Sequence, residues 1–252
     1  MSSTSSNPFR FSTIAHRDHH YLSPLSPSKA RQLLGGLCHG LTAHDVVLDA
    51  GCGKAALLRE LLELCPARGL GVDINAAFLD HARLEWPGPA NRLQLLDCPL
   101  LEHPRGVEAY AAVLCIGSVH AFGSFDECLR ACFEWLKPGG RLLVADGYWK
   151  QQPSTGYLAA INGTLDEFST HAENAQRAQA CGYVVLRTAT SNDDEWDEYE
   201  GKYCNAMMQH LAEHPDDPEA EAFSVRMQNW HMAYLKWGRA TLGFGYYLLM
   251  KP

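Results

Sequence analysis

Short apolar runs alternate with segments of helical period along most of this chain. Continuous apolar runs are typical of strands that are buried on both faces of a parallel sheet. We predict strands within 46–49, 69–75, 92–99, 109–123, 141–149, 183–191 and 242–251. Helical patterns separate them, over 27–39, about 56–65, 76–85, 125–136, 172–181, 192–213 and 219–237, with a KPGG turn at 137–140. Strands that alternate with helices predict an α/β fold whose sheet is covered on both faces.

The last two helical segments are separated by HPDDP and carry aromatic residues at helical spacing. The first has Trp196, Tyr199 and Tyr203, and the second includes Trp230 and Tyr234. Residues three and four positions apart lie on one face of a helix. We therefore predict an antiparallel helical hairpin with an aromatic seam, which serves either as packing alone or as the lining of a pocket.

The N-terminal segment has no clear period. Residues 1–12 are polar and rich in serine, and are expected to be disordered or loosely attached. The following stretch, FSTIAHRDHHYLSPLSPSKA, has an unusual density of histidines before a proline-rich turn. We expect either a solvated loop or a functional lid.

Composition limits the class of protein. With 252 residues and 46% hydrophobic residues, the chain can form one α/β domain with an insertion. A net charge of -8 argues against nucleic acid as the main partner. The sequence has neither a membrane-length apolar run nor the apolar core of a signal peptide, so we expect no membrane partner.

The nine cysteines show no CxxC spacing. We interpret them as reduced thiols of a cytoplasmic protein. Cys128 and Cys132 are one helical turn apart, but neighbouring ligands are missing, so core packing is the preferred interpretation and no metal site is predicted.

Residues 46–58, VVLDAGCGKAALL, are predicted to form a strand, a tight turn and the start of a helix. Gly51 and Gly53 let the backbone turn sharply and approach a ligand closely, because no Cβ atom is in the way. Free N–H groups at the start of the next helix favour an anionic or polar group. This turn therefore predicts the binding of a nucleoside-type cofactor.

These motifs together resemble those of the class I, Rossmann-like methyltransferases that use S-adenosylmethionine (SAM). DAGCG at 49–53 resembles their acid-x-Gly-x-Gly motif, and LKPGGRLLVAD at 136–146 resembles their turn into strand five. The resemblance covers most of 40–190 and returns in the last strand. It implies SAM as the cofactor and a doubly wound sheet with strand order 3-2-1-4-5-7-6, in which strand seven is antiparallel.

The resemblance also implies which residues bind SAM. Asp73, at the end of strand two, would accept hydrogen bonds from both ribose hydroxyls, which suits the two oxygens of a carboxylate. Asp97, at the end of strand three, would accept one from the adenine amino group. Asp49 would orient the turn or meet the amino end of the methionine moiety. The full predicted set is Asp49, Gly51, Cys52, Gly53, Asp73, Ile74, Asp97, Cys98 and Ile116.

The glycine turn also fits a second pattern. Ala55 stands at the third glycine of the common GxGxG motif, and Gly51, Gly53 and Ala56 fit the dinucleotide pattern GxGxxG/A. A dehydrogenase is therefore an alternative. The acids Asp49 and Asp97, together with the KPGG turn, favour SAM.

The acceptor is expected outside the carboxyl ends of the strands, as in other open α/β sheets. His120 follows strand four and is the first candidate for a base or an orienting group, since its ordinary pKa is near neutral. Tyr148 is the second catalytic candidate, with the wall of the pocket as its alternative role. The predicted acceptor-binding residues are His16, Phe122, Trp149, Tyr157, Trp196 and Tyr199.

The N-terminal segment, the GSVHAFG turn and the WDEYE helix resemble a bacterial subgroup of stand-alone methyltransferases. We predict a single domain over 1–252: a lid segment at 1–40, a cofactor-binding core at 41–150 and a hairpin insertion at 192–238. The predicted reaction is methyl transfer to an O, N or S atom of a small molecule. Two alternatives stay open: an enzyme that consumes SAM differently, for example by cyclisation to methylthioadenosine, and a non-catalytic SAM-binding module. The oligomeric state is not predicted.

Overall fold

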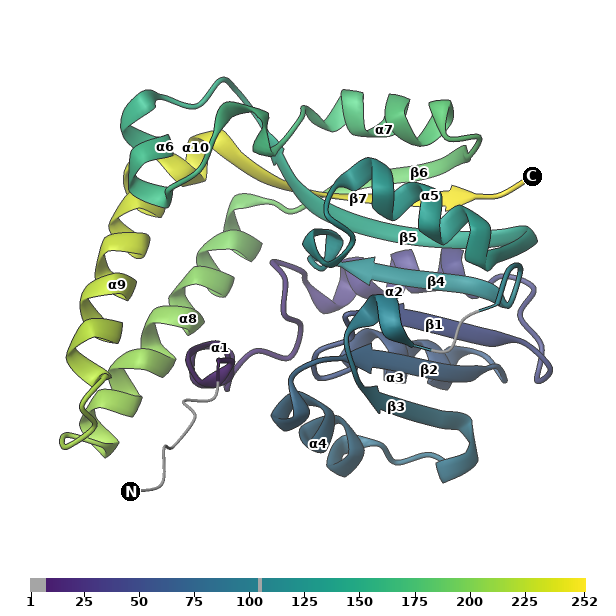
Figure 1. Cartoon of the computed structure of the whole chain (residues 1–252), viewed down its shortest axis with the longest axis horizontal. Helices are drawn as coiled ribbons and strands as arrows, with labels where there is room; N and C mark the ends of the chain where they lie inside the picture. Colours follow the sequence, from purple (N-terminus) through teal and green to yellow (C-terminus); the bar gives the residue numbers. More distant parts are fainter. Residues whose placement is uncertain (1–7, 104–105) are drawn as a thin grey trace.

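A computed structural model of the chain describes residues 8–103 and 106–252 (Figure 1). Its centre is a seven-stranded sheet in the order β3-β2-β1-β4-β5-β7-β6, in which β7 is antiparallel to β5 and β6. The strands are β1 Val46–Ala50, β2 Arg68–Asp73, β3 Leu93–Asp97, β4 Tyr110–Ile116, β5 Leu136–Trp149, β6 Val184–Thr190 and β7 Leu242–Met250. The predicted fold class and strand order are confirmed.

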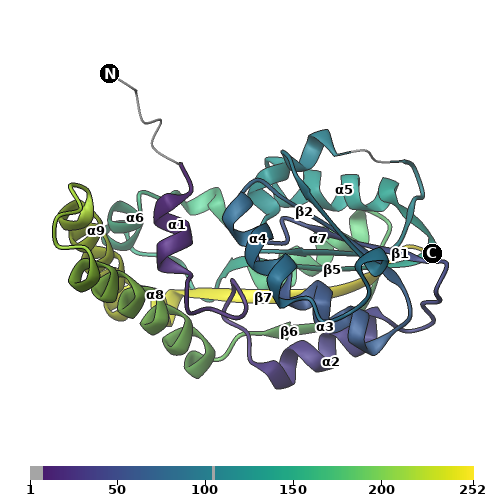
Figure 2. The same ribbon diagram turned by 90° about the horizontal axis from the view of Figure 1, so that it is seen from below.

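Helices cover both faces of the sheet (Figure 2). One face carries α2 (Pro27–Leu37) and α3 (Ala56–Leu64), and the other carries α5 (Phe125–Trp135) and α7 (His171–Ala180). The helix α4 (Ala76–Glu85) follows β2 and packs on β2 and β3. The central strands β1 and β4 are buried almost throughout, because each is covered on both sides. Short 3₁₀ turns occur at Ala90–Arg92, Leu100–Glu102, Val119–Phe122 (η3) and Leu165–Glu167.

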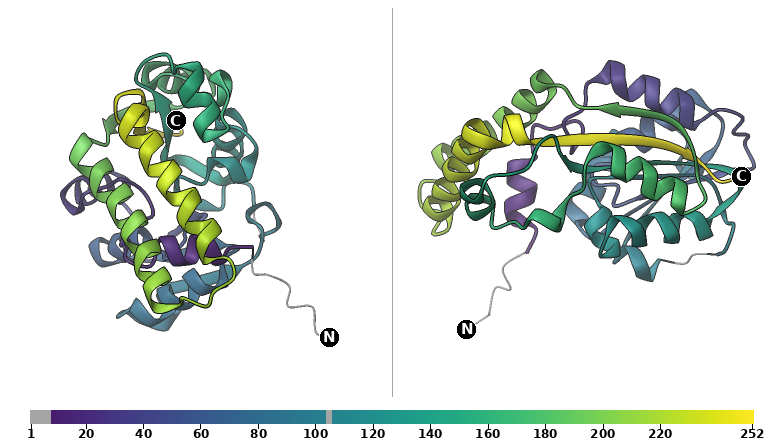
Figure 3. Two further views of the ribbon diagram at one scale, coloured as in Figure 1. Left: turned by 90° about the vertical axis from the view of Figure 1, so that its left-hand side faces the viewer. Right: turned by 90° about the horizontal axis from the view of Figure 1, so that it is seen from above.

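The predicted hairpin is present beyond the carboxyl ends of the parallel strands (Figures 1 and 3). It consists of α8 (Asp193–Glu213) and α9 (Ala220–Ala233). The second predicted helix, 219–237, is not α-helical to its end, because it changes to a π-helical turn, η5, at Tyr234–Gly238. A short helix, α10 (Arg239–Thr241), then leads into β7. The base of the hairpin is therefore joined directly to the sheet, and α6 (Thr155–Ile161) packs against α9.

The expectation of a loose N-terminus is wrong from Arg10 onward; residues 1–7 lie outside the described residues. A helix, α1 (Arg10–Ala15), packs on α8. The ring of Phe11 contacts the rings of Tyr203 and Phe223 on the hairpin. The helix is ordered by these contacts with distant residues, and six residues are too few to show a helical period in the sequence.

The KPGG segment at 137–140 is not a separate turn before the strand, as we predicted, but lies within β5. Tyr110 of β4 pairs with Leu136, whereas Ala112 pairs with Arg141, so β5 has extra residues between two paired positions. Gly139 adopts a φ of +77° there, which a glycine reaches without strain. The segment is therefore an irregularity of the strand, of the β-bulge type.

In the described part of the chain, we find no helix with the length and hydropathy needed to cross a membrane. The same residues also lack a group of three or more His, Cys, Asp or Glu side chains arranged to hold a metal ion.

Candidate functional site

The glycine turn after β1 has a tightly fixed backbone. Gly51, Gly53 and Ala55 all have positive φ angles, of +74°, +52° and +52°. A Cβ atom on Gly51 would lie 2.4 Å from the Cβ of Ser118, whose hydroxyl donates to the carbonyl of Ala50 at 2.5 Å. Only glycine therefore fits at position 51, and the turn is held against the end of β4.

Asp73 connects this turn to the start of α4. One carboxylate oxygen accepts from the N–H of Gly53 at 2.7 Å, and the other accepts from the N–H of Asn75 at 2.8 Å. Burial raises the pKa of Asp73, and these backbone N–H groups lower it. A carboxylate oxygen has two lone pairs, so each oxygen keeps one for a further donor. This donor set fits the two hydroxyls of a ribose.

Asp49, in β1, is a buried acid with 5% of its surface exposed. Burial, followed by the nearby negative charge of Asp73, raises the pKa of Asp49 to about 8. A cation bound beside Asp49 would favour its ionised form. The site is therefore suited to a positively charged ligand group, such as a sulfonium or an ammonium.

Asp97 and Cys98 follow β3 and lie beside Asp73, at a more exposed part of the site. Asp97 is exposed at the end of β3, directly opposite Asp73 in the strand register. The N–H of Cys98 donates to the carbonyl of Asp73 at 3.2 Å. Ile74, which follows β2, is 46% exposed. The exposed Asp97 carboxylate can accept a hydrogen bond from a ligand without the loss of any described contact.

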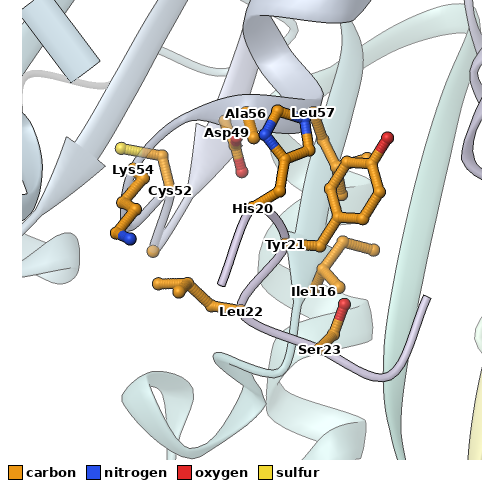
Figure 4. Close-up of a pocket in the computed structure, with 11 residues that line it drawn as sticks. His20, Tyr21, Leu22, Ser23, Asp49, Cys52, Lys54, Ala56, Leu57 and Ile116 are labelled. Atoms are coloured by element: carbon orange, nitrogen blue, oxygen red, sulfur yellow. The ribbon is translucent and has the colours of Figure 1, made fainter. Parts of the chain in front are cut away.

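An N-terminal strap, which we define as residues 16–26 between α1 and α2, crosses the glycine turn (Figure 4). Strap residues 20–23 form one wall of a cavity of about 40 Å³, and the turn, the start of α3 and Ile116 form the other walls. The lining residues are His20, Tyr21, Leu22, Ser23, Asp49, Gly51, Cys52, Lys54, Ala56, Leu57 and Ile116. The strap thus encloses the side of the turn on which Asp49 lies.

Lys54 fastens the strap to the turn. Its Nζ donates to the carbonyl oxygens of His16, Arg17 and His19, at 2.7, 2.9 and 3.0 Å. Only 5% of Lys54 is exposed, and burial lowers its pKa. We did not single out Lys54 in the sequence; its position directly after the glycine motif was the one available signal.

His16 and Tyr199, far apart in the sequence, meet between the strap and α8. His16 Nδ1 lies 2.9 Å from the Ser12 carbonyl, which requires an N–H there, so Nε2 accepts from the Tyr199 hydroxyl at 3.0 Å. Burial lowers the pKa of His16 to about 4. The histidine is therefore neutral, and it connects the strap to the hairpin without lining the cavity beside Asp49.

The turn after β4 separates its two predicted site residues. His120 is exposed on η3, whereas Phe122 is buried and packs on Trp135, with ring centroids 5.5 Å apart. The 3₁₀ turn directs Val119 and Phe122 into the core and His120 outward. Phe122 is therefore packed in the core, and its place in the acceptor site stays a prediction.

Tyr148 and Trp149, at the end of β5, also lie away from the cavity beside Asp49. The ring of Tyr148 lies against His171, with 5.1 Å between centroids. Trp149 is buried against Phe168, and its Nε1 donates to the carbonyl of Leu165 at 2.8 Å. Both side chains are held by the elements that surround β5.

Tyr157 and Trp196 line a second, smaller cavity between α6, α8 and η5. Glu200 and Trp230 lie in the same wall. The sequence pattern placed Trp230 in the aromatic seam but did not identify Glu200, which stands in a run of acidic residues at the start of the helix. The structure therefore divides the predicted site residues among two cavities, the core, the contact between the strap and α8, and exposed positions at the edge of the sheet.

Comparison with known proteins shows a methyltransferase domain in the core of the chain. Residues 47–140 match the family described as "Methyltransferase domain". The chain is 24% identical to the uncharacterized protein YjhP of Escherichia coli, over 96% of this chain and 98% of that protein. It is 33% identical over 110 residues to the erythromycin 3''-O-methyltransferase of Saccharopolyspora erythraea, over 42% of this chain and 36% of that enzyme.

A solved structure has the same fold over almost its full length. The SAM-dependent methyltransferase of Geobacter sulfurreducens, in complex with S-adenosylhomocysteine, superposes with a TM-score of 0.88 at 24% identity, covering 96% of this chain and 98% of that one. SAM is thus the cofactor that accords with the family and with the acids at the glycine turn. Residues 47–140 match a methyltransferase domain, and the chain as a whole has the fold of the class I, Rossmann-like SAM-dependent methyltransferases.

Proposed function

We propose that this enzyme methylates an O, N or S atom of a small molecule. The observation that carries the proposal is the enclosure of the site. The strap covers the glycine turn, and the hairpin lies beyond the carboxyl ends of the strands (Figures 1 and 4). An acceptor has to fit beneath these segments, which favours a small molecule over a protein or nucleic-acid chain. The net charge of -8 supports the same choice.

In this proposal the ends of β1, β2 and β3 hold SAM. Asp73 accepts from the ribose hydroxyls, Asp97 accepts from the adenine amino group, and Asp49 faces the positively charged part of the cofactor. The remaining predicted contacts are Gly51, Cys52, Gly53, Ile74, Cys98 and Ile116. Bound SAM supplies an activated methyl group. The protein's part is to bind and orient both reactants and to exclude water, and the strap serves this last purpose.

His120 is the residue that we propose to orient the acceptor or to accept its proton. It follows β4 at the carboxyl edge of the sheet, and its side chain is exposed. No hydrogen bond from the described residues holds its imidazole in another role. Tyr148 is a weaker candidate, because its ring packs against His171.

We also propose that the chain acts as one unit, in which 41–150 binds the cofactor while 1–40 and 192–238 close the site. The contacts of α1 and of His16 with the hairpin support joint movement of these two segments. All nine cysteines are unpaired, which supports a reducing compartment such as the cytoplasm.

Mass spectrometry of the purified protein tests the proposed reaction. The protein is incubated with SAM alone and then with SAM and a pooled metabolite extract. S-adenosylhomocysteine that forms only with the extract would support transfer, and the acceptor can be traced by its added methyl mass. Methylthioadenosine from SAM alone would instead identify a SAM-cleaving or cyclising enzyme. Tight SAM binding without turnover across many acceptors would identify a binding module.

A further inference from the structure

The turn η3, which carries His120, is short and is bordered by two glycines. Gly117 and Gly123 have φ angles of +70° and +99°, which glycine adopts without strain. Within the turn, the N–H of Ala121 donates to the carbonyl of Ser118 at 3.0 Å. The N–H of Gly123 donates to the carbonyl of His120 at 3.1 Å. These bonds are local, so the place of η3 relative to the cofactor turn depends on other contacts.

The core holds one side of η3. Val119 and Phe122 are 3% and 7% exposed and belong to the apolar cluster that includes residues of α5. Apolar contacts of this kind have no preferred direction. They keep the turn on the sheet but do not by themselves fix its distance from the glycine turn after β1.

Ser118 holds the other side of η3, toward the cofactor turn. Its hydroxyl donates to the carbonyl of Ala50 at 2.5 Å. Among the residues that the structure describes, this is the hydrogen bond that joins 118–123 to β1 and the glycine turn. The Sγ atom of Cys115 lies 3.6 Å from the same hydroxyl oxygen. Ser118 is 8% exposed, so little water competes for the bond, and a hydrogen bond, unlike an apolar contact, is directional.

Steric contact fixes the same pair from the opposite direction. A Cβ atom on Gly51 would lie 2.4 Å from the Cβ and 2.6 Å from the Oγ of Ser118. The glycine turn therefore cannot move closer to Ser118, and the bond to Ala50 keeps the two from separating. A displacement of the glycine turn in either direction thus displaces Ser118 and the start of η3.

Both ends of this connection border the cofactor space. Gly51 and Ile116 line the cavity beside Asp49, and Ile116 precedes Ser118 by two residues (Figure 4). A ligand that fills this cavity contacts the glycine turn and the end of β4 at once. It therefore acts on the two segments that the Ser118 hydroxyl joins.

We infer that Ser118 is a positioning residue, which holds η3 and His120 against the cofactor turn, so that a ligand in the turn orders the acceptor side of the site. The inference rests on the proposed function, in which His120 orients the acceptor or accepts its proton. Methyl transfer requires an in-line approach of the two reactants. Ser118 contributes to that geometry by fixing the distance between the cofactor turn and the turn that carries His120.

Hydrogen exchange with S-adenosylhomocysteine (SAH) as the probe tests the inference on the full-length protein. NMR follows the amides of Ala121 and Gly123, which report on η3. We expect SAH to slow their exchange about fivefold or more, as is usual for coupled sites. In Ser118→Ala, SAH should still slow exchange of the glycine turn but leave η3 unaffected. Ser118→Thr keeps the hydroxyl and should respond as the parent does.

The ratio of exchange rates with and without SAH separates positioning from a purely structural role. If Ser118 only stabilised the fold, Ser118→Ala would exchange faster in both conditions and the ratio would stay as in the parent. Ser124→Ala is the matched control, because Ser124 follows η3 and its hydroxyl bonds to Glu127 of α5 instead of the glycine turn. It should keep the parent's ratio.

Two results would overturn the inference. One is equal protection of η3 by SAH in the parent and in Ser118→Ala. The other is SAH binding to the parent without any protection of η3, which is decided without a variant and so holds even if Ser118→Ala does not fold. The measurement uses neither an acceptor nor turnover, so its failure is distinct from failure of the methyl-transfer proposal.

Discussion

The ammonium of Lys54 donates to the carbonyl oxygen of His16 across 2.7 Å, so a residue of the glycine turn holds the segment that covers it. Two further carbonyls of the strap share the same ammonium. The covering segment and the cofactor turn are thus one connected structure. Any change that releases Lys54 should free the strap while the sheet stays folded.

Lys54→Met should therefore loosen the strap. The variant keeps the apolar stem but leaves three strap carbonyls without their shared donor, at a cost of about 1–3 kcal/mol for each group that stays buried. Hydrogen exchange of residues 16–26 should accelerate, while that of β1 and β4 stays slow. Lys202→Met, on the more exposed Lys202–Glu198 pair, is the control and should leave strap exchange unchanged. Equal protection of the strap in both variants would contradict the role of Lys54.

Asp73→Ala should weaken SAM binding. The change removes a half-buried carboxylate that can accept two hydrogen bonds from the ribose, and we expect a loss of about 1.5–3 kcal/mol per bond to a charged group. Calorimetry with SAM measures the effect. Asp80→Ala, an exposed acid on α4, is the control and should bind SAM as the parent does. An unchanged affinity in Asp73→Ala would refute its assignment to the ribose.

SAM affinity should depend on pH through Asp49. Its pKa is about 8 in the protein, so below pH 8 the carboxyl is protonated, and a bound cation favours release of that proton. Affinity should rise with pH up to about 8, by at most tenfold per pH unit, and then level off. Calorimetry in buffers of different ionisation enthalpy should detect the released proton. In Asp49→Asn this part of the pH dependence should disappear, while the titration of SAM itself remains.

Asp49 should also affect stability. In the unfolded chain, the pKa of this carboxyl is close to its ordinary value of about 4. Between pH 4 and pH 8 the unfolded state therefore loses a proton that the folded state keeps, so the contribution of Asp49 to stability falls as pH rises through this window. Thermal unfolding of the parent and of Asp49→Asn should show a growing advantage of the variant between these pH values. A constant difference would contradict the raised pKa.

His120→Ala should lower turnover more than SAM affinity. The side chain is exposed after β4 and makes no described hydrogen bond that its loss would break, so the fold should be unaffected. Once the acceptor is known, general acid–base catalysis of about 10²–10⁴-fold would be lost if His120 takes the acceptor proton. A parallel fall in SAM affinity would make it a cofactor-site residue instead. His214→Ala, at the tip of the hairpin, serves as a control.

Local sequence patterns were enough to predict the sheet and the cofactor turn. An apolar strand such as Val47–Ala50 is stable only where helices bury both of its faces, so its place in the sheet can be predicted from its residues. The positive φ angles of the turn explain the glycines at 51 and 53. The strand order came from the resemblance to a known family. The structure confirms that order.

Other features depend on contacts that the sequence pattern does not reveal. Lys54 matters because the chain returns to place three carbonyls around its ammonium. Glu200 stands in a run of acidic residues in the sequence, and its burial results from the packing of α9 against α8 and of α6 against α9. The burial of Phe122 was not evident from the sequence, because the direction of a side chain on a short 3₁₀ turn depends on the elements packed around it.

The backbone at Ala55 narrows the residue types that this position can accept. Its φ of +52° costs a residue with a Cβ atom about 1–2 kcal/mol relative to a right-handed conformation. Asparagine and aspartate reach such angles more readily, but Ala55 is fully buried in an apolar cluster, where their polar atoms would lack partners. A larger apolar residue would have the same backbone strain, and its side chain would also not fit in the packed core. Two independent constraints therefore leave glycine and alanine as the compatible choices, and the chain uses the one that fills the core.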